Sequence, residues 1–98
     1  DCSDYTYKLE YKDYLVGYFA VTKLKDNIAD LNAFYVAEPY RQNKTVANFI
    51  LVALYTITKD FDKVVAESLT DVNTIPSTVW DGKTIHMNRI ENFVKKVT

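Results

Sequence analysis

Cysteine, histidine, proline and glycine are scarce in this chain, and their scarcity excludes several classes of protein. The 98 residues contain one cysteine, one histidine, two prolines and two glycines. A disulfide needs two cysteines and a metal site needs several ligands, so Cys2 and His86 predict neither. No apolar run reaches the roughly 20 residues of a membrane helix, and the start DCSDYTYK lacks a signal-peptide pattern. We therefore expect a soluble, cytoplasmic and metal-free protein.

Charge is balanced, and this argues against nucleic acid as the partner. Twelve basic and thirteen acidic residues leave a net charge of -1, with 48% hydrophobic residues. That composition is typical of one small globular domain and gives no field that would attract a polyanion. The eight tyrosines could stack on bases, but Tyr5, Tyr7 and Tyr11 alternate along the chain, which favours packing on a sheet.

The first third of the chain reads as three antiparallel strands. Residues 5–12 alternate, with Tyr5, Tyr7, Leu9 and Tyr11 on one predicted face and Thr6, Lys8, Glu10 and Lys12 on the other. Residues 14–24 and 28–36 are rich in β-branched and aromatic side chains, and the polar segments Lys12-Asp13 and Lys25-Asp26-Asn27 suit turns. Within the second strand, Gly17 predicts a bulge or a close approach of another element.

The rest of the chain changes period. Pro39 ends the third strand near Val36, and apolar residues then follow helical spacing from Thr45 to Lys59-Asp60, with Asn43 or Gln42 at the start. The predicted buried face comprises Val46, Phe49, Ile50, Ala53, Leu54 and Ile57. A strand at 63–69, parallel to an earlier one, a loop at 70–82 containing Trp80, and an amphipathic helix at 85–97 follow. The fold class is therefore α+β or α/β: a mixed, mostly antiparallel sheet of order β-β-β-α-β-α with helices packed on it.

Two segments resemble the GNAT acyl-CoA N-acyltransferase superfamily. YKDYLVGYFAV is similar to that family's second and third strands, and LNAFYVAEPYRQNKTVANFIL is similar to its fourth strand, splayed turn and cofactor helix. The resemblance covers Tyr5 to Thr98 and is most specific from Val36 to Ile50. It implies one GNAT-like domain at 1–98. The family's first strand, first two helices and last strand pair would then lie in other parts of a longer protein or be absent.

The resemblance also implies an acetyl-CoA site at the turn before the helix, where free backbone amides and the helix dipole hold a pyrophosphate. The residues that it places there are Tyr35, Val36, Arg41, Gln42, Asn43, Lys44, Thr45, Val46, Ala47 and Asn88. Arg41 is either a phosphate anchor or a solvated loop arginine. The family's loop glycines correspond to Lys44 and Val46, or in the next register to Thr45 and Ala47.

The catalytic groups that the family uses are largely replaced. The tyrosine that protonates the thiolate corresponds to Val94 or Phe93, and neither side chain can donate a proton. Glu38 is a candidate base for the attacking amine, although an exposed loop glutamate before a proline is the commoner explanation, and we favour it. His86 reads as a residue at a helix start, so no catalytic residue is assigned.

Three functions remain open. The first is an acetyltransferase-like domain that binds acetyl-CoA and transfers an acetyl group to an amine. The second is a catalytically inactive structural or protein-interaction module that kept the fold; such degraded loops are familiar among phage-encoded relatives, in host cytoplasm or virion. The third is an unrelated small α+β binding domain. An exposed sheet edge would suit a protein partner or self-association.

Overall fold

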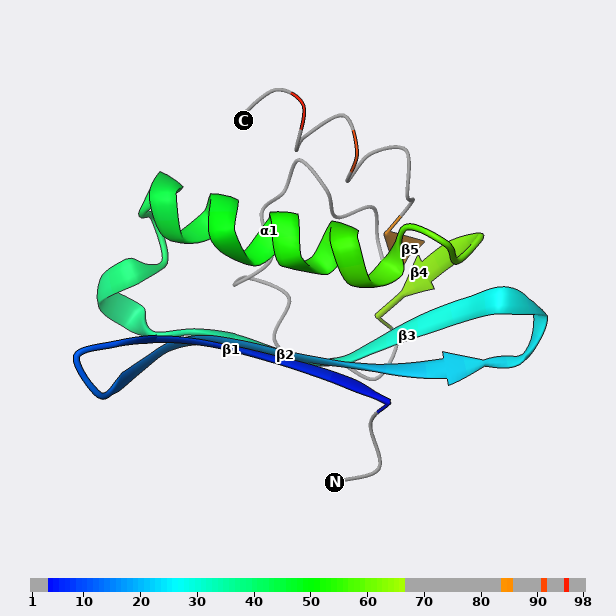
Figure 1. Cartoon of the computed structure of the whole chain (residues 1–98), viewed down its shortest axis with the longest axis horizontal. Coiled ribbons are helices and arrows are strands. Elements are labelled where there is room, and N and C mark those ends of the chain that lie inside the picture. Colours follow the sequence, from blue (N-terminus) through cyan, green and yellow to red (C-terminus); the bar gives the residue numbers. More distant parts are fainter. Residues whose placement is uncertain (1–3, 67–83, 86–90, 92–94, 96–98) are drawn as a thin grey trace.

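The protein is an α+β structure in which one long helix covers one face of a mixed sheet. The computed structural model describes residues 4–66, 84–85, 91 and 95. The sheet has five strands in the order β1-β2-β3-β4-β5 (Figure 1). They are β1 (Tyr5–Tyr11), β2 (Tyr14–Leu24), β3 (Ile28–Val36), β4 (Lys63–Val65) and β5 (Thr84–Ile85). The helix is α1 (Lys44–Thr58), and the short 3-10 turns are η1 (Lys25–Asn27) and η2 (Glu38–Tyr40).

Two tight turns join the first three strands, at the positions predicted. Lys12 and Asp13 have φ values of 49° and 68°, the left-handed pair that a two-residue hairpin requires. Asp26 and Asn27, with φ of 62° and 58°, turn the chain between β2 and β3. Pairing is antiparallel in both hairpins, so the predicted meander is confirmed.

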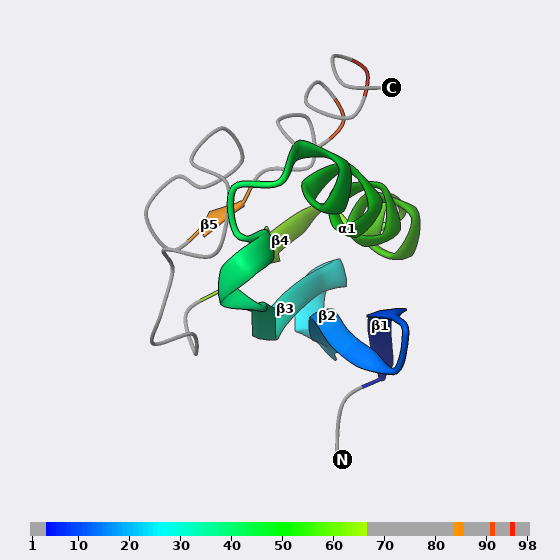
Figure 2. The same ribbon diagram turned by 90° about the vertical axis from the view of Figure 1, so that its left-hand side faces the viewer.

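Helix α1 begins and ends where its caps predict. Asn43 is the N-cap, its side chain accepting a hydrogen bond from the Val46 amide, and Lys59 is the C-cap. The helix then leads into β4, which runs parallel to β3, as a crossover connection predicts. Viewed from the side, α1 lies above the sheet (Figure 2). The buried core between them comprises Phe19, Val21, Ala29, Leu31, Val36, Ile50, Leu51, Leu54, Val64 and Ala66.

Gly17 allows α1 to approach the sheet closely. A Cβ at this position would lie 2.5 Å from Ile50 Cδ1 and 3.3 Å from Ile50 Cγ1. The β1–β2 register also shifts beside it, because Leu9 faces Gly17 while Glu10 faces Leu15. Both readings of this glycine, a bulge and a close approach, are therefore confirmed.

Two aromatic side chains expected in the core are exposed instead. Tyr5, Tyr7 and Leu9 pack against the core as predicted, whereas Tyr11 is 58% exposed. Phe49 is 57% exposed. The buried face of α1 is rotated toward Leu51, which is fully buried, so the prediction for Phe49 was wrong.

The C-terminal third differs from the prediction at two points. Of the predicted strand 63–69, residues 63–65 form β4, Ala66 follows it without strand structure, and residues 67–69 lie outside the described residues. Ile85, expected at the start of a helix, belongs to β5, which pairs antiparallel with β4. Glu91 and Lys95 are helical, and their side chains form an ion pair of 2.9 Å. Cys2, the loop at 70–82 with Trp80, His86, Asn88, Phe93 and Val94 lie outside the described residues.

Candidate functional site

The turn that joins β3 to α1 is a compact series of hydrogen-bonded turns. The Ala37 amide donates to the Val16 carbonyl (2.8 Å) and so continues the β2–β3 ladder by one residue. The Tyr40 amide then donates to the Ala37 carbonyl (2.8 Å), and the Asn43 amide to the Tyr40 carbonyl (3.1 Å). The segment that was expected to be a splayed, phosphate-binding turn is therefore fixed by its own backbone.

Asn43 uses one of the amides that a phosphate would need. Its Oδ1 accepts from the Val46 amide at 3.1 Å, and its carbonyl accepts from the Ala47 amide at 3.0 Å. A helix start offers an anion only those N–H groups that the protein leaves unbonded. Among the described residues, the amides of Lys44 and Thr45 are the ones left at this helix start.

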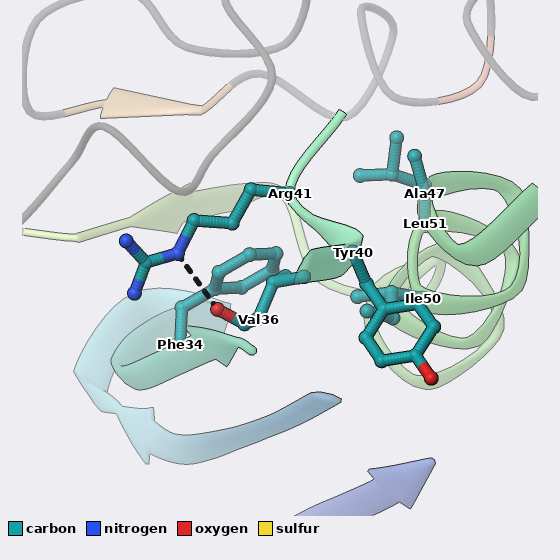
Figure 3. Close-up of a pocket in the computed structure, with 7 residues that line it drawn as sticks. All are labelled: Phe34, Val36, Tyr40, Arg41, Ala47, Ile50 and Leu51. Atoms are coloured by element: carbon teal, nitrogen blue, oxygen red, sulfur yellow. Dashed lines mark hydrogen bonds between the residues drawn. The ribbon is translucent and has the colours of Figure 1, made fainter. Parts of the chain in front are cut away.

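Arg41 turns back onto the end of β3. Its Nε donates to the Val36 carbonyl at 2.9 Å, as the dashed line in Figure 3 marks. The Ala37 amide is hydrogen-bonded to Val16, and bonded and non-bonded pairs alternate along an antiparallel ladder. The next pair, Gly17 and Val36, is therefore a non-bonded pair, and the Val36 carbonyl points away from β2. Beyond Asp30 no described strand pairs with β3 on that side. Arg41 thus satisfies an edge carbonyl of β3.

A small cavity lies beneath this turn. It is lined by Phe34, Val36, Tyr40, Arg41, Ala47, Ile50 and Leu51, with a volume of about 20 Å³ (Figure 3). A cavity that holds one water needs about 10–15 Å³ by the same measure. The space between β3 and α1 therefore has room for about one water molecule.

The structure brings together some of the predicted site residues and separates others. Val36, Arg41 and Ala47 line the cavity. Tyr35 lies on the opposite face of β3 from Phe34 and Val36, since neighbouring strand residues alternate, and it is 42% exposed. The side chains of Gln42, Asn43, Lys44 and Thr45 are exposed on the turn and first helical turn, and Val46 is half-buried. Glu38 is exposed in η2, as its simpler explanation predicted.

Sequence reasoning did not assign Phe34, Tyr40, Ile50 or Leu51 to this site. Phe34 could have been found from its strand spacing, because it lies two residues before Val36 and shares its face. Leu51 lies four residues after Ala47, on the same side of α1. Tyr40 carried no periodic signal, since it lies in an irregular turn.

No family model, no curated protein and no solved structure matches this chain. Within residues 4–66 and the few described beyond them, no cluster of three or more potential metal ligands occurs. The same part of the chain contains no helix with the length and apolar character to cross a membrane.

Proposed function

We propose that this chain is a non-catalytic protein-interaction module built on a GNAT-like fold. The observation that carries the proposal is the occupation of the turn after β3 by the protein's own groups. The Val46 amide is bonded to Asn43 and the Val36 carbonyl to Arg41. A GNAT-like cofactor site would use free backbone groups at these two places.

The space at the turn supports the same conclusion. Small-molecule sites enclose far more volume than one water molecule, typically about 300–1,000 Å³ in total. The cavity below Arg41 and Tyr40 has room for about one water, with a volume of about 20 Å³. A pantetheine arm would enter only if α1 moved away from β3, which the buried pair Ile50 and Leu51 opposes.

Exposed apolar side chains give the surface a character suited to a partner. Large apolar side chains with exposed fractions of 42% to 73% are Tyr11, Tyr14, Leu15, Leu24, Tyr35 and Phe49. Tyr11 and Tyr14 face each other across the first hairpin, next to the Glu10–Leu15 pair. Aromatic side chains that are exposed in a group mark protein interfaces more often than isolated ones do.

Acetyl-CoA binding, with or without acetyl transfer, is the second candidate. The observation in its favour is the pair of unbonded amides at Lys44 and Thr45, beside the exposed Lys44 side chain at the positive end of α1. These groups could hold one phosphate. They provide no acid or base for the transfer itself.

Isothermal titration calorimetry with acetyl-CoA separates the two candidates. The proposal predicts no saturable heat at about 1 mM ligand, a concentration that detects binding with a free energy of about −4 kcal/mol or stronger. A micromolar Kd would contradict it. Asn43→Gly frees the Val46 amide; binding that appeared only in this variant would identify the cap as the obstacle, and Asn48→Gly in the middle of α1 is the matched control.

A further inference from the structure

Strand β1 forms one edge of the sheet, with no described strand on its outer side (Figure 2). It spans seven residues, Tyr5–Tyr11, and none of them is proline. An edge strand of this length presents unpaired N–H and C=O groups to any other strand of matching register. The question is which strand this edge fits.

The hydrogen-bond alternation determines which residues of β1 point outward. Gly17 and Val36 form a non-bonded pair, so the backbone N–H and C=O groups of Gly17 point away from β3 and toward β1. Leu9 is the β1 residue opposite Gly17. The backbone of Leu9 is therefore bonded to β2, as are those of Tyr7 and Tyr5 by the same alternation. The outward-pointing backbone groups belong to Thr6, Lys8 and Glu10.

The side chains of these outward residues carry opposite charges two positions apart. In β2, Tyr18 lies opposite Lys8 and Leu15 lies opposite Glu10. Neither charged residue of β1 therefore has an oppositely charged cross-strand partner in β2. Both side chains are exposed on the sheet face away from α1. A second copy of β1 has the same pattern, and antiparallel pairing would place a lysine of one copy against a glutamate of the other.

Only one antiparallel register achieves this. Backbone bonding requires outward residues to face outward residues, which leaves four registers with a two-fold axis from Tyr7 to Glu10. An axis at Tyr7 sets Thr6 against Lys8 twice and pairs no opposite charges. An axis at Lys8 sets two lysines against each other, and an axis at Glu10 sets two glutamates against each other, which is unfavourable. An axis at Leu9 pairs Lys8 with Glu10 of the second copy twice.

We propose that two copies of this chain associate through β1 in that register, forming one continuous sheet. On the face covered by α1, Tyr7 would lie opposite the exposed Tyr11 of the second copy, and Leu9 opposite its own counterpart. Aromatic and apolar cross-strand pairs of this kind stabilise sheets. The exposure of Tyr11, which the single chain does not explain, is removed in the dimer.

Helix α1 fits the same arrangement. Leu51 lines the cavity on the β3 side, and Phe49 lies about 200° around the helix from it, so Phe49 faces the β1 side. A two-fold axis perpendicular to the sheet puts both helices on one face. Since α1 contacts both β1 and β2, the two helix axes would lie two strand spacings apart, about 10 Å. Helices pack at about 8–10 Å, so the two Phe49 side chains would fill the space between them.

Sedimentation velocity on the 98-residue chain tests the proposal, with about 1–100 µM protein. The wild type is expected to move from a species of 11.3 kDa to one of twice that mass. Lys8→Glu and Glu10→Lys each place like charges opposite one another twice, and each is expected to raise the dimer Kd about tenfold or more. Lys25→Glu and Glu38→Lys, which make the same charge changes away from β1, should leave it unchanged.

Mixing the two variants is the decisive step. In a mixed dimer the glutamate introduced by K8E faces the lysine introduced by E10K, and the unchanged Glu10 of the first chain faces the unchanged Lys8 of the second. The mixture of K8E and E10K should therefore restore association. Circular dichroism checks that each variant is folded. A wild type that stays monomeric at about 100 µM, single variants that dimerise like the wild type, or a mixture that stays monomeric would overturn the proposal.

This inference deepens the proposed interaction role by naming a partner and a surface, and its biological meaning rests on that role. Its failure is distinguishable from failure of the proposed function. Acetyl-CoA calorimetry reports on the turn after β3, whereas sedimentation of the charge variants reports on β1.

Discussion

Gly17→Ala is the substitution that tests the packing of α1 on the sheet most sharply. The added Cβ would lie 2.5 Å from Ile50 Cδ1, about 1 Å closer than the 3.5–4.0 Å at which two carbons attract. Ile50 is 1% exposed, and the cavity beside it has a volume of about 20 Å³, so its side chain has little room to turn. The helix or the side chain must therefore shift.

The size of the effect follows from two opposing contributions. Overpacking of this kind costs about 1–3 kcal/mol, while replacing a strand glycine by alanine recovers about 0.5–1 kcal/mol of unfolded-state entropy. We expect Gly17→Ala to lower the free energy of unfolding by up to about 2.5 kcal/mol, as measured by urea denaturation followed by circular dichroism. For a domain of this size that corresponds to a fall in Tm of up to about 20 °C.

A double-mutant cycle separates this contact from other effects of the alanine. Ile50→Val removes the clashing Cδ1 and alone costs about 0.5–1.5 kcal/mol. Combined with Gly17→Ala it should cost less than the sum of the two, with a coupling of about 1 kcal/mol. Ile57→Val, farther along α1, should simply add. Additive behaviour at Ile50, or a stabilising Gly17→Ala, would refute the close approach described here.

Three further substitutions test the turns and caps. Asn43→Ala removes the N-cap of α1 and should destabilise the protein by about 1 kcal/mol in urea denaturation. Arg41→Met keeps the apolar stem but leaves an edge carbonyl of β3 without its donor, which should cost about 1 kcal/mol by the same assay. Lys12→Asn with Asp13→Gly places residues suited to positive φ in the first hairpin turn and should raise Tm, since the free energy of unfolding should increase by about 0.5–1 kcal/mol.

Each of these has its own control. Asn43→Ser retains a capping oxygen and should be nearly neutral, so a loss equal to that of alanine would argue against the cap. Lys44→Met removes a neighbouring exposed cation and should change stability by less than about 0.5 kcal/mol. Asp13→Ala should destabilise, and a gain there would be inconsistent with the left-handed backbone at that position.

The parts of the fold that were predictable from sequence are those with local signals. Alternation predicted β1, and the β-branched and aromatic runs predicted β2 and β3. The turn segments Lys12-Asp13 and Lys25-Asp26-Asn27 indicated where the first two strands end. The capping role of Asn43 is equally local, because its partner lies three residues away. Such features depend on neighbours in sequence and survive in any tertiary context.

The wrong predictions concern residues whose structure is determined by contacts between segments far apart in the sequence. The helical spacing of the residues after Ile85 predicts that a helix starts there, but Ile85 lies in β5 and pairs with Val64 of β4. Phe49 fitted the apolar stripe of α1, yet the helix buries Ile50, Leu51 and Leu54 and leaves Phe49 exposed. Neither the pairing of β5 with β4 nor the packing of α1 on the sheet can be predicted from the local spacing of apolar residues.

The candidate site shows the same division. The resemblance to the GNAT family placed the site from Val36 to Ala47, and that placement stays a prediction. The hydrogen bond from Arg41 to Val36 was not predicted, because it depends on the path of η2 and on the free edge of β3. That bond gives Arg41 a part in fixing the turn, a role that neither sequence interpretation, a phosphate anchor or a solvated loop arginine, had included.

The most direct test of this account follows the backbone amides of the turn by NMR. A ¹⁵N-labelled sample would be titrated with coenzyme A while the amide signals of Lys44, Thr45 and Val46 are recorded. Because the Val46 amide is bonded to Asn43, the account predicts no saturable shift of its signal up to about 1 mM ligand, which corresponds to binding weaker than about −4 kcal/mol. Saturable shifts of all three signals at micromolar ligand would show that these amides bind the pyrophosphate, and would contradict it.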